Sequence, residues 1–278
     1  FTIAAGLHEN LISVDTNFLN LKKQITCGKN IIREYDDEIP SNLTAEQILI
    51  RSGNIGSVRI GQKLGIEKLK NFLTDIGVLN KINFDIEEIG SPIKFRWGKC
   101  KLATASFGHG ITTTPLQLAK GYAIISNGGF EVNPTLLKKE KEKEKKRIIR
   151  KGVSEEINLI LRKIVNTKEG TANFANIEGY EVGGKTGTAQ KSTEGGYSKE
   201  KVNTFAAVFP TSKPKYVLVV VLDEPKLSKD YIYHYKDGSG IKFKGTPFNT
   251  AGWTTVEVTG KILEKIGPIL ATKYIQNK

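Results

Sequence analysis

Methionine is absent from the 278-residue sequence, and cysteine occurs only at Cys27 and Cys100. Two cysteines without a C-x-x-C spacing make neither a disulfide-rich scaffold nor a cysteine metal site, and they leave the redox compartment open. No apolar run reaches the length of about 18 residues that a membrane-spanning helix requires, and no signal-peptide pattern is present. These absences describe a globular protein for which we expect no metal ion and no cofactor.

Arginine is also scarce, because the formal net charge of +13 rests on 35 lysines and only 7 arginines. Phosphate and base recognition favour the planar guanidinium fork of arginine over the ammonium group of lysine. Lysine, isoleucine and asparagine are abundant together, which is typical of AT-rich coding. We interpret the positive charge as compositional background and expect no nucleic-acid partner.

The first residue is Phe1 rather than the methionine of a complete translation product. Apolar residues with helical spacing follow at once, at Phe1, Ile3, Ala4, Ala5 and Leu7, but no capping residue precedes them. We therefore expect a helix whose first turn lies upstream of Phe1. The first turn of a helix presents free N–H groups and often carries a nucleophile.

Before residue 111, the sequence predicts two helices, and its signals for secondary structure in the segments around them are weak. The stretch up to about residue 40 is predicted as loop, and a capped helix is expected from Asn42 or Thr44 to Ile50. The apolar pattern can resume as a helix over residues 55–64, and turn residues predict an irregular segment over 77–110.

Two later helices are better defined. Thr114 is placed to cap a helix with Pro115 at its first position, and this helix is expected to stop at residues 127–129, Asn-Gly-Gly. A second helix is expected to begin near Ser154, with one apolar face. The alternating lysines and glutamates of residues 138–151 predict a solvated segment between the two helices.

The last third of the chain changes to the pattern of β-strands. Two runs rich in β-branched residues, 202–209 and 216–222, are joined by a turn and predict an antiparallel hairpin. Residues 181–191 are plausible as a third strand at the edge, and a final helix is expected between residues 250 and 270. Helices first, strands later and a closing helix predict a single α+β domain over residues 1–278.

One lysine belongs to two motifs. Residues 179–186, ending in Gly184-Lys185-Thr186, match the phosphate-binding pattern GxxxxGK[ST], and the strand that ends at Asp223 resembles a magnesium-binding strand end. A phosphate loop needs a buried strand before it and a helix directly after it. Polar and glycine-rich residues flank this motif on both sides, so we disfavour a nucleotide hydrolase.

The alternative combines Lys185-Thr186-Gly187 with Ser52 and Asn54 of an S-x-N triplet. On an edge strand, a K-T-G motif can add an extended peptide as a further strand while the lysine attracts its terminal carboxylate. The S-x-N hydroxyl can transfer a proton, and its amide can hold a peptide carbonyl. With a serine in S-x-x-K, these form the three-motif set of penicillin-interacting enzymes.

Longer motifs carry a resemblance to a known family. The chain is similar to class B penicillin-binding proteins of the division type over essentially its whole length, in the family's order. The matching segments are Phe107-Gly108-His109-Gly110-Ile111, Thr114-Pro115-Leu116-Gln117-Leu118-Ala119, Asn127-Gly128-Gly129, Gly170-Thr171-Ala172, residues 184–190, residues 205–210, Pro214, residues 217–225 and Thr250-Ala251-Gly252-Trp253.

The resemblance implies a β-lactamase/transpeptidase-like fold, in which helices flank an antiparallel sheet, and a septal peptidoglycan D,D-transpeptidase activity. Ser52 would relay a proton, and Asn54 would hold the substrate amide. Lys185 would orient Ser52 and attract the carboxylate of a D-Ala-D-Ala stem peptide. Thr186 and Thr188 would bind that carboxylate, Gly187 would leave room for the peptide, and the Thr188 N–H would serve the oxyanion hole, where one donor contributes about 3 to 4 kcal/mol.

The resemblance also implies parts that these residues do not include. The family's S-x-x-K lies a few residues before the position of Phe1, so we expect no nucleophile in this sequence, and N-terminal strands of the sheet, the membrane anchor and a further domain are expected to be missing. Four S-x-x-K strings do occur, all after the S-x-N triplet, and we interpret them as chance. They begin at Ser91, Ser198, Ser212 and Ser239.

The resemblance implies stem peptides, β-lactams and cell-division proteins as partners, at the periplasmic face of the bacterial inner membrane. An inactive remnant or binding module of the same fold is the alternative. In the chain as given, the strand over 216–222 is expected to expose an unpaired edge. Cys27 and Cys100 could pair in an oxidising periplasm, and His8, His109 and His234 are interpreted as structural or groove-lining.

Overall fold

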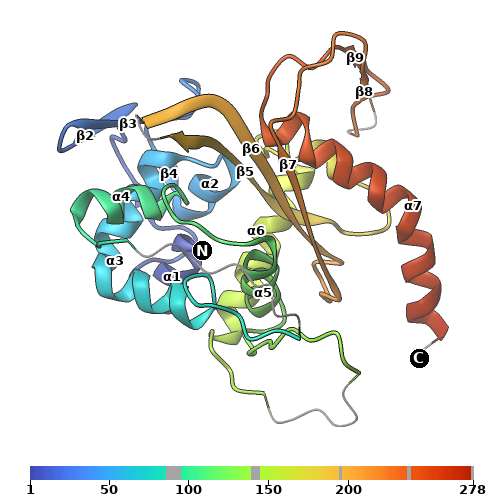
Figure 1. Cartoon of the computed structure of the whole chain (residues 1–278), viewed down its shortest axis with the longest axis horizontal. Helices are drawn as coiled ribbons and strands as arrows, with labels where there is room; N and C mark the ends of the chain where they lie inside the picture. Colours follow the sequence, from blue (N-terminus) through green and yellow to red (C-terminus); the bar gives the residue numbers. More distant parts are fainter. Residues whose placement is uncertain (86–94, 139–144, 194–195, 237–238, 277–278) are drawn as a thin grey trace. The chain divides into compact units, whose positions relative to one another are not determined.

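Helices dominate the first part of the chain and antiparallel strands the second, in a computed structural model that describes residues 1–85, 95–138, 145–193, 196–236 and 239–276 (Figure 1). Contacts between residues divide the chain into a first unit, Phe1–Ile160, and a second unit, Leu161–Lys278. Within the described ranges, no helix combines the length and the apolar content that crossing a bilayer requires.

The core of the first unit is built around one long helix. Helix α3 packs against both α1 and α4. At Gly61 of α3 an added Cβ would lie 1.7 Å from the Ser106 hydroxyl, so only glycine allows this approach of α4. Gly65 interrupts α3 with a left-handed φ of 74°. The helices that begin in this unit are α1 (Thr2–His8), α2 (Ala45–Ile50), α3 (Asn54–Asp75), α4 (Lys99–Ser106), α5 (Pro115–Ser126) and α6 (Lys151–Asn166).

Capping residues fix two helix starts as predicted. Thr44 caps α2 and Thr114 caps α5, and each threonine forms a capping box with the glutamine three residues later. Pro115 occupies the first position of α5, and the helix ends at Ser126, before the Asn-Gly-Gly stop. Phe1 occupies the N-cap position of α1 and makes no side-chain capping hydrogen bond, which agrees with the expected absence of a capping residue.

Several boundaries differ from the predictions. The stretch expected to be loop up to residue 40 contains three short strands, and helix α4 lies in the segment expected to be irregular. Helix α3 extends eleven residues beyond Leu64, and α6 begins at Lys151, before Ser154. The short strands are β1 (Asn17–Phe18), which pairs with β4 (Leu43–Thr44), and β2 (Gln24–Cys27), which pairs with β3 (Asn30–Arg33).

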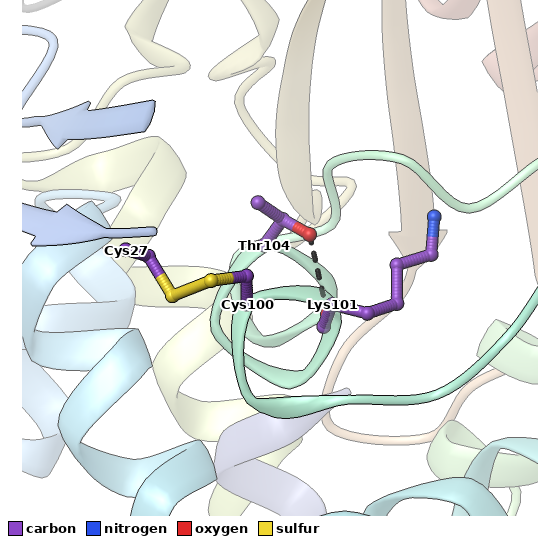
Figure 2. Close-up of a disulfide and its surroundings, with 4 residues drawn as sticks. All are labelled: Cys27, Cys100, Lys101 and Thr104. Carbon is purple, nitrogen blue, oxygen red and sulfur yellow. Dashed lines mark hydrogen bonds between the residues drawn. A yellow bond between two sulfur atoms is a disulfide. The ribbon is translucent and has the colours of Figure 1, made fainter. Parts of the chain in front are cut away.

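A disulfide joins two of these unpredicted elements. Cys27 at the end of β2 is bonded to Cys100 in α4, with their Cα atoms 5.4 Å apart (Figure 2). The pairing was left open by the sequence, because neither β2 nor α4 has a hydrophobic pattern that would place the two cysteines side by side.

Part of the charged segment that was predicted to be solvated, residues 139–144, lies outside the described residues.

The second unit contains a three-stranded antiparallel sheet in the order β5-β6-β7. The predicted hairpin is confirmed with longer strands than expected, and the third strand beside it is confirmed with bounds two residues later than the predicted 181–191. The strands of this unit are β5 (Gly183–Thr193), β6 (Gly196–Phe209), β7 (Tyr216–Asp223), β8 (Ile232–His234) and β9 (Lys242–Lys244). Helix α7 (Thr255–Gln276) packs against β6 and β7, which confirms the predicted α+β class.

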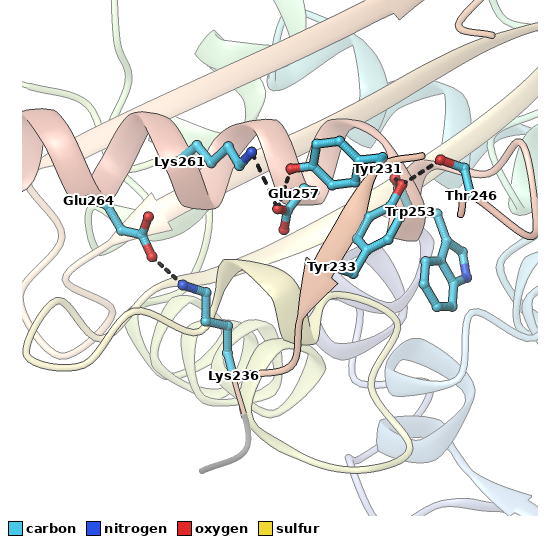
Figure 3. A network of polar contacts seen from close by, with 8 residues as sticks. All are labelled: Tyr231, Tyr233, Lys236, Thr246, Trp253, Glu257, Lys261 and Glu264. Carbon is cyan, nitrogen blue, oxygen red and sulfur yellow. Dashed lines mark hydrogen bonds and ion pairs between the residues drawn. The ribbon is translucent and has the colours of Figure 1, made fainter. Parts of the chain in front are cut away.

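An aromatic and polar network fastens the β8–β9 hairpin to the start of α7 (Figure 3). The Tyr231 hydroxyl donates to the Glu257 carboxylate over 2.7 Å. The buried Tyr233 donates to the carbonyl of Trp253 and packs edge-on against its indole ring. Trp253 ends a short 3-10 helix, Ala251–Trp253, so the final helix starts five residues later than Thr250, the first residue of its predicted range.

Candidate active site

The S-x-N triplet forms the connection between α2 and α3. Ser52 adopts a left-handed φ of 58°, and the N–H of Gly53 returns to the carbonyl of Ile48 over 2.9 Å. Asn54 is the first residue of α3, rather than part of a loop between helices. The tight turn therefore places Ser52 and Asn54 on either side of the glycine at a helix N-terminus.

A carboxylate from the residue that follows strand β3 holds this helix N-terminus. The Glu34 carboxylate accepts hydrogen bonds from the backbone N–H of Asn54 over 2.7 Å and of Ile55 over 2.9 Å. The Asn54 side-chain amide donates to the carbonyl of Arg33 over 2.9 Å. Burial raises the pKa of Glu34, and the two backbone hydrogen bonds oppose that rise.

Sequence analysis missed this support because it predicted loop where β2 and β3 form a hairpin. Tyr35, which follows β3, donates from its hydroxyl to the carbonyl of Arg51, 2.8 Å away, at the end of α2. The disulfide from Cys27 ties the same hairpin to α4 (Figure 2). The S-x-N turn is therefore held by a covalently anchored hairpin, and no local sequence signal indicates that contact.

The K-T-G motif lies on β5, at the edge of the described sheet. Lys185, Thr186, Gly187 and Thr188 are followed in β5 by exposed residues, and β5 pairs with β6 on one side only among the described strands. An edge strand of this kind presents backbone groups to which an extended peptide can add. The structure thus confirms the strand context that the motif requires.

Lys185 is half-buried, and its Nζ donates to the carbonyl of Thr186 over 3.0 Å. Desolvation lowers its pKa to about 8. A group with this pKa is largely protonated at neutral pH, so Lys185 remains a cation that can attract a carboxylate.

Both threonine hydroxyls of the motif have partners within the second unit. The hydroxyls of Thr186 and Thr171 lie 2.8 Å apart. The Thr188 hydroxyl accepts a hydrogen bond from the N–H of Ala251 over 2.9 Å. Thr171 and Ala251 belong to motifs that the sequence analysis quoted for the family, but the motifs alone gave no contact between them and β5.

The structure agrees with the rejection of the phosphate loop. Gly184, Lys185 and Thr186 lie inside strand β5, and the next element is the antiparallel strand β6 rather than a helix. The acidic pair at the end of β7, Asp223 in the strand and Glu224 after it, forms ion pairs with Lys191 over 3.1 Å and 2.8 Å. Neither feature of a nucleotide site is therefore present in the described sheet.

The described S-x-x-K strings do not open helices. Ser198 lies in β6, and Ser212 and Ser239 lie at bends outside helices and strands, while Ser91 is outside the described residues. Among the described residues, no group of three or more histidine, cysteine, aspartate or glutamate side chains could hold a metal ion.

Two of the three histidines contact other groups: the His8 ring accepts from the N–H of Arg150 over 3.3 Å, and His109 stacks on Phe107. His234 lies in β8 and is exposed. The candidate residues themselves fall in two groups, Ser52 and Asn54 in the first unit and Lys185 to Thr188 in the second, and the structure describes each group within its own unit.

The fold class is shared with solved transpeptidase domains. The apo TP domain of penicillin-binding protein 3 from Burkholderia pseudomallei superimposes with a TM-score of 0.83 and 23% identity, covering 97% of this chain and 77% of that one. Penicillin-binding protein 3 from Mycobacterium tuberculosis, solved with ampicillin, gives a TM-score of 0.78 at 21% identity, over 96% of this chain and 60% of that one. These likenesses confirm the predicted fold.

The family follows from the sequence. The model of the penicillin binding protein transpeptidase domain matches residues 1–239, and this chain belongs to that family. The probable peptidoglycan D,D-transpeptidase FtsI of Caulobacter vibrioides is 29% identical over 98% of this chain and 46% of its own length. Stage V sporulation protein D of Bacillus subtilis is 34% identical over 100% of this chain and 42% of its own length. The chain thus spans less than half the length of these relatives.

Proposed function

We propose that this chain is the main part of a peptidoglycan D,D-transpeptidase domain that cross-links stem peptides in septal cell-wall synthesis. The observation that carries the proposal is the Lys185-Thr186-Gly187-Thr188 segment at the open edge of β5, with a protonatable, half-buried lysine. Family membership and the names of relatives such as FtsI support the same function. We propose that residues 1–278 act as one domain, since the family model spans both units.

The edge strand explains how a stem peptide would be held. The peptide adds to β5 as an extended strand, and exposed Gly187 leaves space for its backbone. The terminal D-Ala carboxylate lies against the Lys185 ammonium and the hydroxyls of Thr186 and Thr188. Hydrogen bonds to a charged acceptor contribute about 1.5 to 3 kcal/mol each, so these groups select a peptide with a free carboxyl end.

The S-x-N turn supplies the remaining groups. Asn54 holds the substrate amide, and Ser52 relays a proton under the orientation of Lys185. In the acylation step, a serine hydroxyl attacks the penultimate carbonyl, the bond to the last D-Ala breaks, and the departing amine takes up the serine proton. An amine of a neighbouring stem peptide then attacks the acyl carbonyl, the ester bond to the serine breaks, and the proton lost by the amine returns to the serine oxygen.

The nucleophile in this proposal is none of the three described S-x-x-K serines, because Ser198 lies in a strand and Ser212 and Ser239 lie outside helices and strands. In the resemblance, the serine opens the helix that contains Phe1. We propose β-lactams as ligands of the same groups, and cell-division proteins as partners at the periplasmic face of the inner membrane. The Cys27–Cys100 disulfide supports an oxidising compartment.

Labelling with a fluorescent penicillin tests the function. The 278-residue chain is expected to form no covalent adduct, whereas the chain extended before Phe1 by its own upstream codons, or by a relative's S-x-x-K segment, is expected to label. Lys185→Ala in the extended chain should abolish labelling, and Lys191→Ala, on the same strand, should leave it unchanged. A folded extended chain that never labels would favour the inactive remnant, and an adduct on Ser198 or Ser212 would contradict the assignment.

A further inference from the structure

A six-residue turn, Asn249–Thr254, lies beside the K-T-G strand; we refer to it as the 249–254 turn. Its Ala251 is 1% exposed and donates its N–H to the Thr188 hydroxyl over 2.9 Å. Its Gly252 lies so close to Thr171 that an added Cβ would be 2.9 Å from the Thr171 carbonyl oxygen. The turn therefore contacts both Thr188 and Thr171, the partner of the Thr186 hydroxyl.

The position of the turn is set by a buried asparagine on the neighbouring strand. Asn203 is paired with Thr188 in the β5–β6 register and is 0% exposed. Its side-chain nitrogen donates to the Asn249 side-chain oxygen and to the Thr254 hydroxyl, each over 2.9 Å. One amide group thus binds the first and last residues of the turn.

The turn is also held from its other side. The Asn249 side chain donates to the carbonyl of Pro225 over 2.7 Å, and the Lys201 ammonium donates to the Asn249 carbonyl over 3.0 Å. The Tyr233 hydroxyl donates to the carbonyl of Trp253 (Figure 3). These hydrogen bonds hold both ends of the turn and the carbonyl of Trp253. They therefore keep the N–H of Ala251 pointing toward the Thr188 hydroxyl.

This arrangement sets the direction of the Thr188 hydroxyl. A backbone N–H can only donate, so the Thr188 oxygen must accept from Ala251 and its own proton must be donated elsewhere. An ionised carboxylate only accepts hydrogen bonds, so it is a suitable partner for that proton. A Thr188 hydroxyl without the Ala251 donor could instead present a lone pair to the ligand, which repels a carboxylate.

We propose that Asn203 is a positioning residue for carboxylate recognition: through the 249–254 turn it orients the Thr188 hydroxyl as a donor to the C-terminal carboxylate of the substrate. The inference rests on the proposed function and adds to it a residue outside the three family motifs. It also predicts a specific defect, in which variants at Asn203 lose the distinction between a carboxylate and a neutral end group.

Binding of a matched ligand pair to the isotope-labelled chain, followed by NMR, tests the proposal without requiring the nucleophile. The probes are acetyl-D-Ala-D-Ala and its C-terminal amide. The wild-type chain is expected to bind the carboxylate at least about tenfold more tightly than the amide, which corresponds to one hydrogen bond to a charged group. Asn203→Ala is expected to reduce that preference by about tenfold, mainly by weakening carboxylate binding.

Two further variants separate positioning from folding. Thr254→Val removes one acceptor of Asn203 at a half-buried position and should also reduce the preference, while Thr254→Ser keeps the hydroxyl and should restore it. Asn158→Ala is the matched control, because Asn158 is also buried, with one side-chain donor bond to the Ser126 carbonyl and an unpaired oxygen, but lies in α6. It should lower stability and leave the preference unchanged.

The outcomes distinguish the two proposals. If the wild-type chain does not prefer the carboxylate, the proposed substrate recognition is wrong, and the role of Asn203 with it. If the wild type prefers the carboxylate and the folded Asn203→Ala and Thr254→Val variants keep the full preference, only the role of Asn203 is overturned. An equal loss of preference in Asn158→Ala would show a general effect of stability and would also overturn it.

Discussion

Lys185 has a pKa near the upper end of the physiological range because desolvation lowers it to about 8. A carboxylate ligand favours the protonated ammonium, so its affinity depends on the fraction of protonated Lys185. Below pH 8 the group is mostly charged, and above it the charge is progressively lost. The titration of this lysine therefore links ligand affinity to pH in a direction that the structure defines.

We predict that the affinity for acetyl-D-Ala-D-Ala falls as the pH rises above about 8, by up to tenfold per pH unit. Calorimetry or NMR titration between about pH 7 and pH 9.5 measures the effect. Lys185→Arg is the control, because a guanidinium stays charged over this range and its affinity should be flat. A wild-type affinity that does not change with pH would contradict the assignment of Lys185 to the carboxylate.

Glu34 is the second residue whose ionisation has a measurable consequence. Because burial raises its pKa, the folded chain holds a proton on this carboxyl more readily than the unfolded chain does. Its contribution to the free energy of unfolding is fully present below the ordinary glutamate pKa and is lost as the pH rises through the raised value. Glu34→Gln should remove this part of the pH dependence.

Urea unfolding between about pH 4 and pH 7 compares wild type with Glu34→Gln, and exposed Glu38→Gln serves as the control. Glu34→Ala is expected to lose about 1 to 2 kcal/mol below the ordinary glutamate pKa, since the N–H groups of Asn54 and Ile55 lose their acceptor, and the loss should become smaller as the pH rises through the raised pKa. The same pH profile in wild type and Glu34→Gln would refute this prediction.

At the scale of elements, a helix or strand could be predicted from the sequence when its own residues stabilise it, and not when distant contacts do. Helix α5 has its signals in the sequence itself, with Thr114 as cap and Pro115 at the first position. Strands β5, β6 and β7 likewise have recognisable patterns. Helix α4 and the β2–β3 hairpin have none, because a disulfide and packing against α3 stabilise them.

The candidate site divides in the same way. Lys185, Thr188, Ser52 and Asn54 could be predicted because short motifs mark them. Glu34 and Asn203 could not, since each acts through a hydrogen bond to a residue 20 or more positions away in the chain. A buried polar side chain is recognised by its partners, and partners that are distant in sequence become visible only in the fold.

The disulfide gives the prediction at this scale. Cys27 and Cys100 are separated by 73 residues, and closing a loop of this length in the unfolded chain stabilises the fold by about 4 kcal/mol in the chain-entropy account. Reduction should lower the urea midpoint and speed hydrogen exchange at the N–H of Asn54 and Ile55, which the anchored hairpin holds. The Cys27→Ser, Cys100→Ser double variant should be insensitive to reductant, and an unchanged wild-type midpoint after reduction would contradict the prediction.

At the scale of the whole chain, one edge of the described sheet can promote aggregation. Among the described strands, β7 pairs with β6 on one side only, and its apolar Val221 is 38% exposed. An unpaired apolar edge is a template for association with other chains. The sequence predicted that the strand over residues 216–222 has an exposed edge, and in the structure this strand, β7, is the last strand of the described sheet.

We predict concentration-dependent aggregation of the 278-residue chain, reduced by Val221→Lys with little change in the urea midpoint. Light scattering during heating measures it. Leu159→Lys is the matched control, because Leu159 is 65% exposed on helix α6 and offers no strand edge. A cooperative, monomeric melt of the wild-type chain, or equal improvement by both lysine variants, would count against the role of the β7 edge.

The hydrogen bonds of Asn203 also have a consequence for how this sequence can diverge. Buried Asn203 and half-buried Asn249 and Thr254 form one hydrogen-bonded group, although up to 51 positions separate them in the chain. Changing one of them alone leaves polar atoms of the others unsatisfied, whereas an apolar replacement of all three removes that penalty. We expect relatives to keep the trio or exchange it as a set, so covariation among homologues would reveal the contact without a structure.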